Sequence, residues 1–342
     1  MKIVPFPKVK PKIPFKPRLS FGLDLGSHFI KLVKLSVLKD SVNIEGFAVE
    51  PVGLDLEGLL KRHFQSFGIK KLNLSLSGLQ TITRYTDFPK MSNDEFKQAL
   101  KFEAQKHIPF PLSEVNVDGF ILKDDLPDNK MLVLLAAAKK DAIESRIKLC
   151  DNLGVRLGAV DIDSIALINT FNHNYSDDES IKDKAVALLN IGATESNLNI
   201  LDSGFPRLSR DIHIAGNHFT KKISDIQGLE FKEAEKIKVS PEKQTSSVIS
   251  CIDNVLSNLA RDLRTSFDYY ESQNASSVSR IYLTGGSSMF AGLRESLTNL
   301  MGIQVEHWDV LRNITIADTV DSDKLKQYSG QLAVAIGLAL RT

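Results

Sequence analysis

The residues best suited to chemistry in this sequence form one short turn, Asp24-Leu-Gly-Ser-His28. From Phe21 onward, apolar residues alternate up to the turn, which is the two-residue period of a strand. Gly26 is expected to give the backbone the freedom for a sharp reversal into a second strand. Such a turn exposes a row of backbone N–H groups that suits phosphate oxygens. Asp24 could then hold a hydrated Mg²⁺ beside those phosphates.

The same pattern returns much later in the chain. Leu188–Thr194 aligns with Gly22–His28 without a gap, and Leu198 then falls on Leu32. A single Asp-x-Gly turn is more often an ordinary hairpin, but two turns in register indicate duplicated architecture. The pair predicts two lobes that each offer a phosphate loop to one nucleotide. A third element, Ile281–Ser288, is a strand running into Gly-Gly, where the backbone could approach an adenosine closely.

Strands and helices must hold these turns in place, and the sequence predicts both. Runs that alternate apolar and polar residues indicate strands, whereas apolar residues three or four apart indicate helices. We expect further strands at Ser41–Val49, Leu72–Gly78, Ile82–Tyr85, Val115–Leu122, Met131–Ala137, Val155–Ile162 and Phe205–Ile212. We expect helices at Leu54–Phe67, 92–104, 141–153, Ser164–Phe171, Phe219–Ile226, Phe231–Ile237, Val248–Ser272, Leu293–Leu300 and Leu332–Leu340.

The middle of the first half has an organisation of its own. Ser92 with Glu95, and Asp141 with Glu144, have the spacing of a capping box that opens a helix. The polar residues 123–130 are predicted to form a loop between two strands. The resulting strand–helix–strand–strand–helix–strand order, over roughly 74–161, predicts a compact α+β insert.

Composition narrows the class of protein. A chain of 342 residues holds about two domains. A net charge of +1 gives no overall attraction to nucleic acid, so we expect no nucleic-acid partner. Cys150 and Cys251 have neither metal-ligand spacing nor a disulfide framework, which favours a reduced, cytoplasmic compartment. The longest apolar runs, Met131–Ala138 and Leu332–Leu340, are far shorter than the ~20 residues of a membrane-spanning helix.

Residues 1–18 form a basic, proline-rich tail. They carry six basic residues, no acid, and prolines that favour an extended, polyproline-like chain. Subtracting those six charges from +1 leaves −5 for residues 19–342. Attraction to an anionic membrane surface, worth ~1 kcal/mol per Lys or Arg near the lipid, and a solvated leader both fit this composition. The tail has no continuous apolar run of the kind that marks a secretory signal.

Taken together, these residues resemble the actin-like ATPase superfamily, its FtsA-like branch, and within that branch the PilM family of type IV pilus assembly. The resemblance covers residues 19–342. The Ile108-Pro-Phe-Pro111 stretch that follows an acidic helix is its most characteristic part. The motifs fall in the family's order, at Asp24–Ser27, Lys31–Val33, Glu103–Leu112, Val133–Lys140, Val160–Asp163, Asn190–Thr194 and Thr284–Gly286.

The resemblance implies an α/β fold of the actin-like (ribonuclease H-like, duplicated) ATPase type, with an FtsA-type inserted α+β subdomain. The first lobe (1A) would comprise 19–73, 162–184 and 330–342, and the inserted subdomain (1C) 74–161. The second lobe (2A) would comprise 185–214 and 280–329, and subdomain 2B 215–279. The tail, 1–18, would lie outside these four parts.

The resemblance also implies that ATP lies between the lobes with Mg²⁺. The residues that would contact phosphates are Gly26, Ser27 and His28 on one side and Gly192, Ala193 and Thr194 on the other. Further contacts to the nucleotide would come from Gly216, Gly285, Gly286 and Ser287. Mg²⁺ would be held through water by Asp24 and Asn190.

Three more residues match superfamily positions, and each has a plainer alternative. Glu235 and Lys238 fall where relatives hold the ribose and adenine. They are also three apart on one helix face, as in a surface ion pair. Asp163 falls where relatives place a water-orienting catalytic acid, but a helix cap explains it equally well.

One departure from the family pattern bears on catalysis. The second phosphate motif usually carries Asp, and here it carries Asn190. An amide can hydrogen-bond a metal-bound water but brings no charge to Mg²⁺, and phosphoryl transfer depends on such charges. We therefore expect ATP to bind and to be hydrolysed slowly or not at all.

Three functions fit the sequence, and an assembly adaptor ranks first. The family implies a cytoplasmic protein that binds the N-terminal cytoplasmic peptide of PilN, a single-pass protein of the bacterial inner membrane. An active ATPase or sugar kinase is the second, because kinases share this fold. An FtsA-like membrane-tethered filament protein is the third, although FtsA-like chains carry an amphipathic helix after the core that we do not expect here. Whether copies of the chain form a homo-oligomer stays open.

Overall fold

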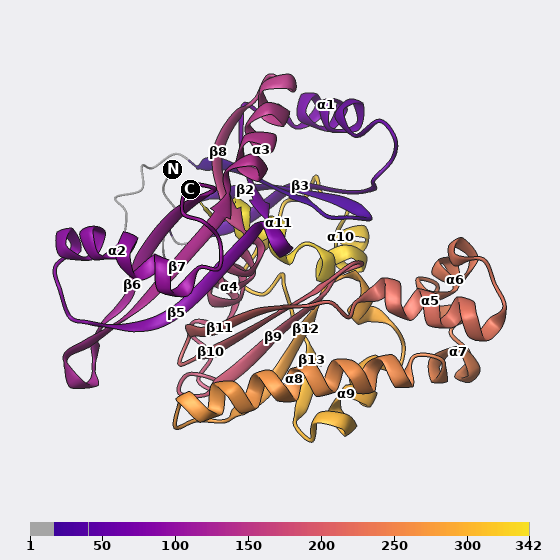
Figure 1. The fold of residues 1–342 in the computed structure, drawn as a ribbon. Coiled ribbons are helices and arrows are strands. Elements are labelled where there is room, and N and C mark those ends of the chain that lie inside the picture. The colour runs from indigo at the N-terminus through magenta and orange to yellow at the C-terminus, as the bar shows by residue number, and fades with distance from the viewer. Residues whose placement is uncertain (1–16, 40, 342) are drawn as a thin grey trace.

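The computed structural model describes residues 17–39 and 41–341 (Figure 1). Three β-sheets of six, five and three strands form its framework. Most of the expected basic tail lies outside the described residues. Its last residue, Arg18, already belongs to a strand, because it pairs with Val37 in the first sheet.

The first sheet carries the first hairpin turn. Its antiparallel meander of three strands is extended by parallel strands on both sides. In spatial order it contains β14 (Thr315–Ile316), β3 (Val42–Pro51), β2 (Phe29–Val37), β1 (Arg18–Leu25), β4 (Lys71–Leu76) and β8 (Arg156–Ile162). One face packs against α1 (Leu56–Phe67) and α3 (Lys140–Asn152).

The second sheet repeats this arrangement around the second hairpin turn. In spatial order it contains β11 (Phe205–Ile212), β10 (Ser196–Asp202), β9 (Ala185–Ile191), β12 (Val278–Thr284) and β13 (Gln304–His307). Its outer face packs against α5 (Gly216–Gln227), α6 (Phe231–Lys238), α7 (Ser246–Ser250), α8 (Asp253–Gln273) and α9 (Leu293–Met301). The duplicated hairpins thus sit in two separate layers, as the repeat predicts.

A shared core joins the two large sheets. It contains α4 (Asp163–Tyr175) and α11 (Ala333–Ala339), and α10 (Ser322–Tyr328) contributes Leu325. Aromatic rings fill its centre, where Phe171 lies 5.0 Å from Tyr282 and 5.3 Å from Trp308 between ring centroids. The packing is close enough that a Cβ on Gly337 would come within 1.9 Å of the Ala166 carbonyl oxygen. The two lobes are therefore fastened at this point.

The third sheet lies within residues 74–161, where the sequence predicts an insert. It contains, in spatial order, β5 (Thr81–Pro89), β7 (Lys130–Lys139) and β6 (Val115–Leu126), with α2 (Asn93–His107) against one face. The insert also contacts the second lobe, because the Tyr85 hydroxyl lies 3.2 Å from Ser209 Oγ. Figure 1 shows β5 running toward the edge of β11.

Most expected elements are confirmed within a few residues, and three local predictions are wrong. The polar stretch 123–130 extends the hairpin, since β6 continues to Leu126. Asp141 and Glu144 form no capping box, because Lys139 is the N-cap and Asp141 accepts a hydrogen bond from the Ala142 N–H instead. The expected helix Val248–Ser272 is two helices, α7 and α8.

One other local prediction is confirmed. Ser92 and Glu95 form the expected capping box at the start of α2. Both cysteines are free and buried. In the described part of the chain, no helix combines the length and the apolar character needed to cross a bilayer.

Candidate nucleotide-binding site

The two hairpin turns meet face to face. Ser27 Oγ, in the turn between β1 and β2, lies 3.3 Å from Thr194 Oγ1, in the turn between β9 and β10. A second contact lies alongside, because a Cβ on Gly78 would come within 2.5 Å of Glu195 Oε1. Two segments that are 167 residues apart in the chain therefore form one site.

Both turns present backbone N–H groups that have no partner in the described chain. The N–H groups of Gly26, Ser27 and His28 donate no hydrogen bond to a described residue, and neither do those of Ala193 and Thr194. The Gly192 N–H differs, because it donates to the Glu195 carbonyl at 3.1 Å. Rows of free N–H groups in a turn bind anions such as phosphate. This arrangement fits a nucleotide's phosphates.

Glycine is needed in these turns for space, which corrects the expected reason for Gly26. Its φ lies outside the left-handed region. A Cβ there would instead come within 2.8 Å of the Phe29 carbonyl oxygen and 2.5 Å of Lys31 Nζ. Gly192 is similar, since a Cβ would come within 2.7 Å of the Glu195 carbonyl oxygen. Both glycines let the returning strand pass close to the turn.

Each turn is preceded by a polar residue that pairs across its hairpin. Asp24 lies opposite Lys31 in the strand register, and Lys31 Nζ is 3.0 Å from Asp24 Oδ2. At the equivalent place in the second hairpin, Asn190 Nδ2 donates to Asn197 Oδ1 at 3.2 Å. The first lobe therefore holds an ion pair where the second holds a pair of neutral amides.

Hydrogen bonds join the second turn to the N-terminus of α5. The Gly192 carbonyl accepts from the Gly216 N–H at 3.0 Å and from Ser287 Oγ at 3.0 Å. The Ala193 carbonyl accepts from the Asn217 N–H at 2.8 Å. A Cβ on Gly216 would lie 2.0 Å from Ser287 Oγ, so only glycine permits this packing.

Glu235 and Lys238 lie behind α5 and form more than a surface ion pair. Lys238 is only 5% exposed, and its Nζ is 2.8 Å from Glu235 Oε2. Lys238 also donates to the Gly216 carbonyl at 3.2 Å, and Thr220 Oγ1 donates to Glu235. Burial lowers the pKa of Lys238, and the Glu235 carboxylate opposes that shift. The pair fastens α6 to the start of α5, beside the second turn.

The Gly-Gly turn lies against the second hairpin. Gly285 has a φ of +92°, and a Cβ there would come within 2.4 Å of the Ile191 carbonyl oxygen. Its N–H donates to the Gly330 carbonyl at 2.7 Å, which ties the turn to the segment before α11. Gly286 has more room, because the nearest atom to its Cβ position is Gln331 Cδ at 3.4 Å.

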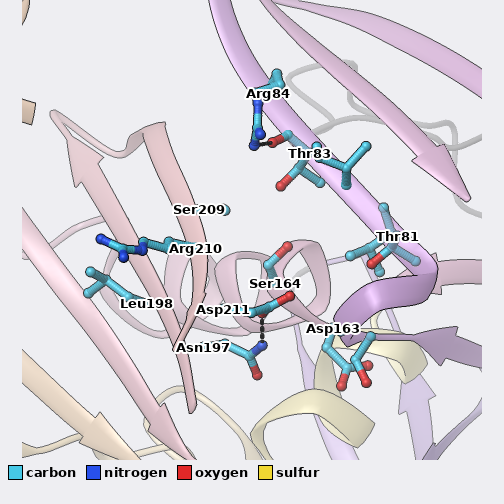
Figure 2. Close-up of a pocket in the computed structure, with 14 residues that line it drawn as sticks. Thr81, Thr83, Arg84, Asp163, Ser164, Asn197, Leu198, Ser209, Arg210 and Asp211 are labelled. Carbon is cyan, nitrogen blue, oxygen red and sulfur yellow. Dashed lines mark hydrogen bonds between the residues drawn. The ribbon is translucent and has the colours of Figure 1, made fainter. Parts of the chain in front are cut away.

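Asp163 lies at the start of α4, where it lines a polar cavity of about 210 Å³ (Figure 2). Ile162 is the N-cap of this helix, so the alternative role of Asp163 as a helix cap is wrong. Burial, and next the carboxylate of Asp24, raise the pKa of Asp163 to about 7. A carboxyl group with a pKa near neutrality can accept or release a proton at physiological pH.

Sequence reasoning missed several residues of this site. Lys31 pairs with Asp24, and Asn197 bonds to Asn190. Asp211 lines the same cavity as Asp163. The repeat contains the signal for two of them, because Lys31 and Asn197 stand seven residues after Asp24 and Asn190. Arg146, on α3, lines a hollow with Gly26, and its Nε is buried without a hydrogen-bond partner among the described residues.

The residues fit Mg²⁺ only as a companion of the nucleotide. In the part of the chain that the structure describes, no group of three or more His, Cys, Asp or Glu side chains could hold a metal ion. Mg²⁺ usually keeps several waters and is bound by one or two carboxylates plus substrate phosphates. Asp24 could supply that carboxylate, and phosphate and water oxygens would have to supply the other ligands.

Comparison with known proteins identifies the family and the fold of this chain. Residues 22–342 match the family of type IV pilus assembly protein PilM. A chain of the PilM–PilN type IV pilus biogenesis complex superposes with a TM-score of 0.82 at 25% identity, covering 94% of this chain and 98% of that one.

Two further structures share the fold. Ethanolamine utilization protein EutJ from Carboxydothermus hydrogenoformans superposes with a TM-score of 0.58 at 13% identity, covering 96% of this chain and 92% of its own. MreB 5 of Spiroplasma citri bound to AMPPNP superposes with a TM-score of 0.50 at 11% identity, covering 95% of each chain. These likenesses show an actin-like ATPase fold, and the family match over residues 22–342 shows that this chain belongs to the type IV pilus assembly protein PilM family.

Proposed function

We propose that this protein binds ATP between its two lobes and serves as an adaptor in type IV pilus assembly at the cytoplasmic face of the bacterial inner membrane. One observation carries the nucleotide part. Two glycine turns from separate lobes face each other at Ser27 and Thr194, and both present unpartnered N–H groups. Such groups bind phosphate oxygens. Family membership supports the pilus part.

The proposed partner is the N-terminal cytoplasmic peptide of a PilN-like inner-membrane protein. The support is the likeness to a chain of the PilM–PilN complex, which spans 94% of this chain. The four-part division into 1A, 1C, 2A and 2B remains part of this proposal, with the β5–β7–β6 sheet as the insert. The basic residues 1–18 would add contact with anionic lipid.

ATP would act mainly as a structural ligand. The second lobe offers Asn190 where a carboxylate would bring negative charge to Mg²⁺, and Lys31 already neutralises Asp24 in the first. Gly26, Ser27 and His28 would position phosphates together with Gly192, Ala193 and Thr194. Gly216, Glu235, Lys238 and the 285–287 turn would bound the nucleoside. Asp163 would orient water, and the small negative charge around the metal would keep turnover slow.

The partner is tested by equilibrium binding of a fluorescent peptide. The peptide would carry the cytoplasmic N-terminus of the PilN-like protein from the same genome, with a scrambled peptide as the control. We expect saturable binding of the native peptide alone, measured by anisotropy with and without ATP. Equal binding of both peptides, or of neither, would overturn the adaptor proposal.

A separate experiment tests the tail. Deleting residues 1–18 should reduce co-sedimentation with vesicles that contain anionic lipid and leave peptide binding intact. Arg18 in β1 pairs with Val37 in β2, so a deletion of 1–16 is the matched control that leaves the first sheet complete. Unchanged vesicle binding in both deletions would remove the membrane role of the tail.

A further inference from the structure

Three polar side chains form a line across the second sheet. Asn190 on β9 lies directly opposite Asn197 on β10, which in turn lies directly opposite Asp211 on β11. Asn190 Nδ2 donates to Asn197 Oδ1 at 3.2 Å, and Asn197 Nδ2 donates to Asp211 Oδ1. Figure 2 shows the second of these bonds at the edge of the polar cavity. The line begins at the residue that replaces the usual carboxylate of the second phosphate motif.

The carboxylate at the far end determines the direction of both hydrogen bonds. An ionised Asp can only accept, whereas an Asn amide has one accepting oxygen and one donating nitrogen. In its ionised form, Asp211 therefore requires Asn197 to turn its nitrogen toward β11. That orientation leaves the Asn197 oxygen facing β9, where it requires the nitrogen of Asn190. Reversing either amide would place two acceptors or two donors against each other.

As a consequence, Asn190 keeps its oxygen free. Asn190 Oδ1 accepts no hydrogen bond within the described part of the chain, and it lies 2.6 Å from the position of a Cβ on Gly285. The free oxygen thus stands between the second hairpin and the Gly-Gly turn. Mg²⁺ binds oxygen ligands, and the waters that it keeps donate hydrogen bonds to acceptors. The line of side chains therefore leaves the Asn190 oxygen, and not its nitrogen, available to accept a hydrogen bond from a metal-bound water.

We propose that Asp211 is a positioning residue that acts through Asn197 to hold the oxygen of Asn190 toward the hydrated Mg²⁺ of the bound nucleotide. This inference rests on the proposed binding of ATP and deepens it. The charge that orients Asn190 thus comes from Asp211 on β11, a strand outside the β9–β10 hairpin that carries the second phosphate motif. Outer residues that orient metal-facing groups typically change metal affinity about 10- to 100-fold when mutated.

The test compares ATP affinity in Mg²⁺ with ATP affinity in EDTA, measured by calorimetry on the full chain. Asp211→Asn frees Asn197 to rotate, so we expect the ratio of the two affinities to fall roughly tenfold. Affinity in EDTA should stay within about twofold, because the N–H groups of the turns are untouched. Asp202→Asn is the matched control, since Asp202 lies at the other end of β10 and accepts from Tyr270 and Ser276. It should leave the ratio unchanged.

A double variant tests the direction of the line itself. In N190D/D211N the carboxylate stands at the β9 end, Asn197 can reverse, and both hydrogen bonds can form again with the opposite polarity. Because the new carboxylate at position 190 itself adds charge at the proposed Mg²⁺ site, the readout of this variant is the Asn197 side-chain amide and not the Mg²⁺ dependence. Side-chain amide resonances of Asn197 should shift in D211N without any nucleotide present, and should show a bonded amide again in the double variant.

The outcomes separate this inference from the proposed function. If the wild type binds ATP and D211N keeps the full Mg²⁺ ratio, the positioning role is overturned while ATP binding stands. If D211N loses affinity equally in Mg²⁺ and in EDTA, Asp211 is only structural and the inference is again overturned. A wild type that does not bind ATP at all would overturn both.

Discussion

The ammonium nitrogen of Lys31 lies 3.0 Å from Asp24 Oδ2, directly across the first hairpin. The side chains are 17% and 9% exposed, so the pair is largely screened from water. Asp24 therefore has a counter-charge before any nucleotide or metal binds. This pairing distinguishes the first lobe from the second, where the equivalent residues are both Asn.

Lys31→Met should destabilise the protein because it leaves the Asp24 carboxylate unpaired. We expect the free energy of unfolding to fall by roughly 1–3 kcal/mol, since a fully buried pair loses about 3–5 kcal/mol. Urea denaturation of the variant measures this. Lys34→Met, on the same strand, is the control. The double variant D24N/K31M should recover most of the loss, and no recovery would show that the charge of Asp24 is not the cause.

Gly285→Ala and Gly286→Ala should differ sharply. A Cβ on Gly285 meets the Ile191 carbonyl oxygen at 2.4 Å and the residue has a φ of +92°, so the turn must move. We expect a loss of about 2 kcal/mol or more of stability and a large loss of ATP affinity. Gly286→Ala meets nothing closer than 3.4 Å and should fold normally. Equal stability of the two variants would contradict the geometry of this turn.

The pKa of Asp163 gives a pH dependence with a definite sign. Its pKa rises from an ordinary value near 3.8 to about 7 in the folded protein, chiefly through burial. Folding therefore favours the protonated acid, and the associated stability is present below pH ~4 and is lost as the pH rises through ~7. Asp163→Asn removes this loss. The free energy of unfolding of the variant should therefore exceed that of the wild type by about 1–3 kcal/mol at pH 8 and equal it at pH 4.

Denaturation at several pH values measures that difference. Asp177→Asn, at an exposed carboxylate, is the control and should show no such trend. A difference between Asp163→Asn and wild type that does not change with pH would contradict the raised pKa of Asp163.

Asn190→Asp should raise ATP turnover by about tenfold, the equivalent of ~1.4 kcal/mol in the barrier. The reason is that a carboxylate adds negative charge at the proposed Mg²⁺ site, where phosphoryl transfer depends on electrostatics. Phosphate release measures the rate, with Asn299→Asp, at an exposed position of α9, as the control. If the rate does not rise, the slow chemistry has a cause other than Asn190.

The local order of the chain could be predicted from the sequence because each signal lies within one element. The alternation in Phe21–Leu25 and its copy before Asn190 identify both hairpins, and Gly68 ends α1 in the left-handed conformation, as a helix stop should. The capping box at Ser92 works because its two residues are three apart in the same turn of helix.

What could not be predicted depends on register and on neighbours from elsewhere in the chain. The line from Asn190 to Asp211 requires three strands at one level, which no local pattern contains. The capping box at Asp141 fails because β7 runs directly into α3, which begins at Lys140, so Asp141 lies inside the first turn and not at the N-cap. The burial of Lys238 follows from the packing of α6 against α5, not from its spacing to Glu235.

The most direct test of the central claim is a calorimetric titration of the full chain with ATP and Mg²⁺, with Gly285→Ala as the reference variant. The account predicts saturable binding at one site in the wild type, a strong loss in Gly285→Ala, and little phosphate released during the titration. No binding heat at millimolar ATP in the wild type would contradict it, because the two facing turns would then not be a nucleotide site.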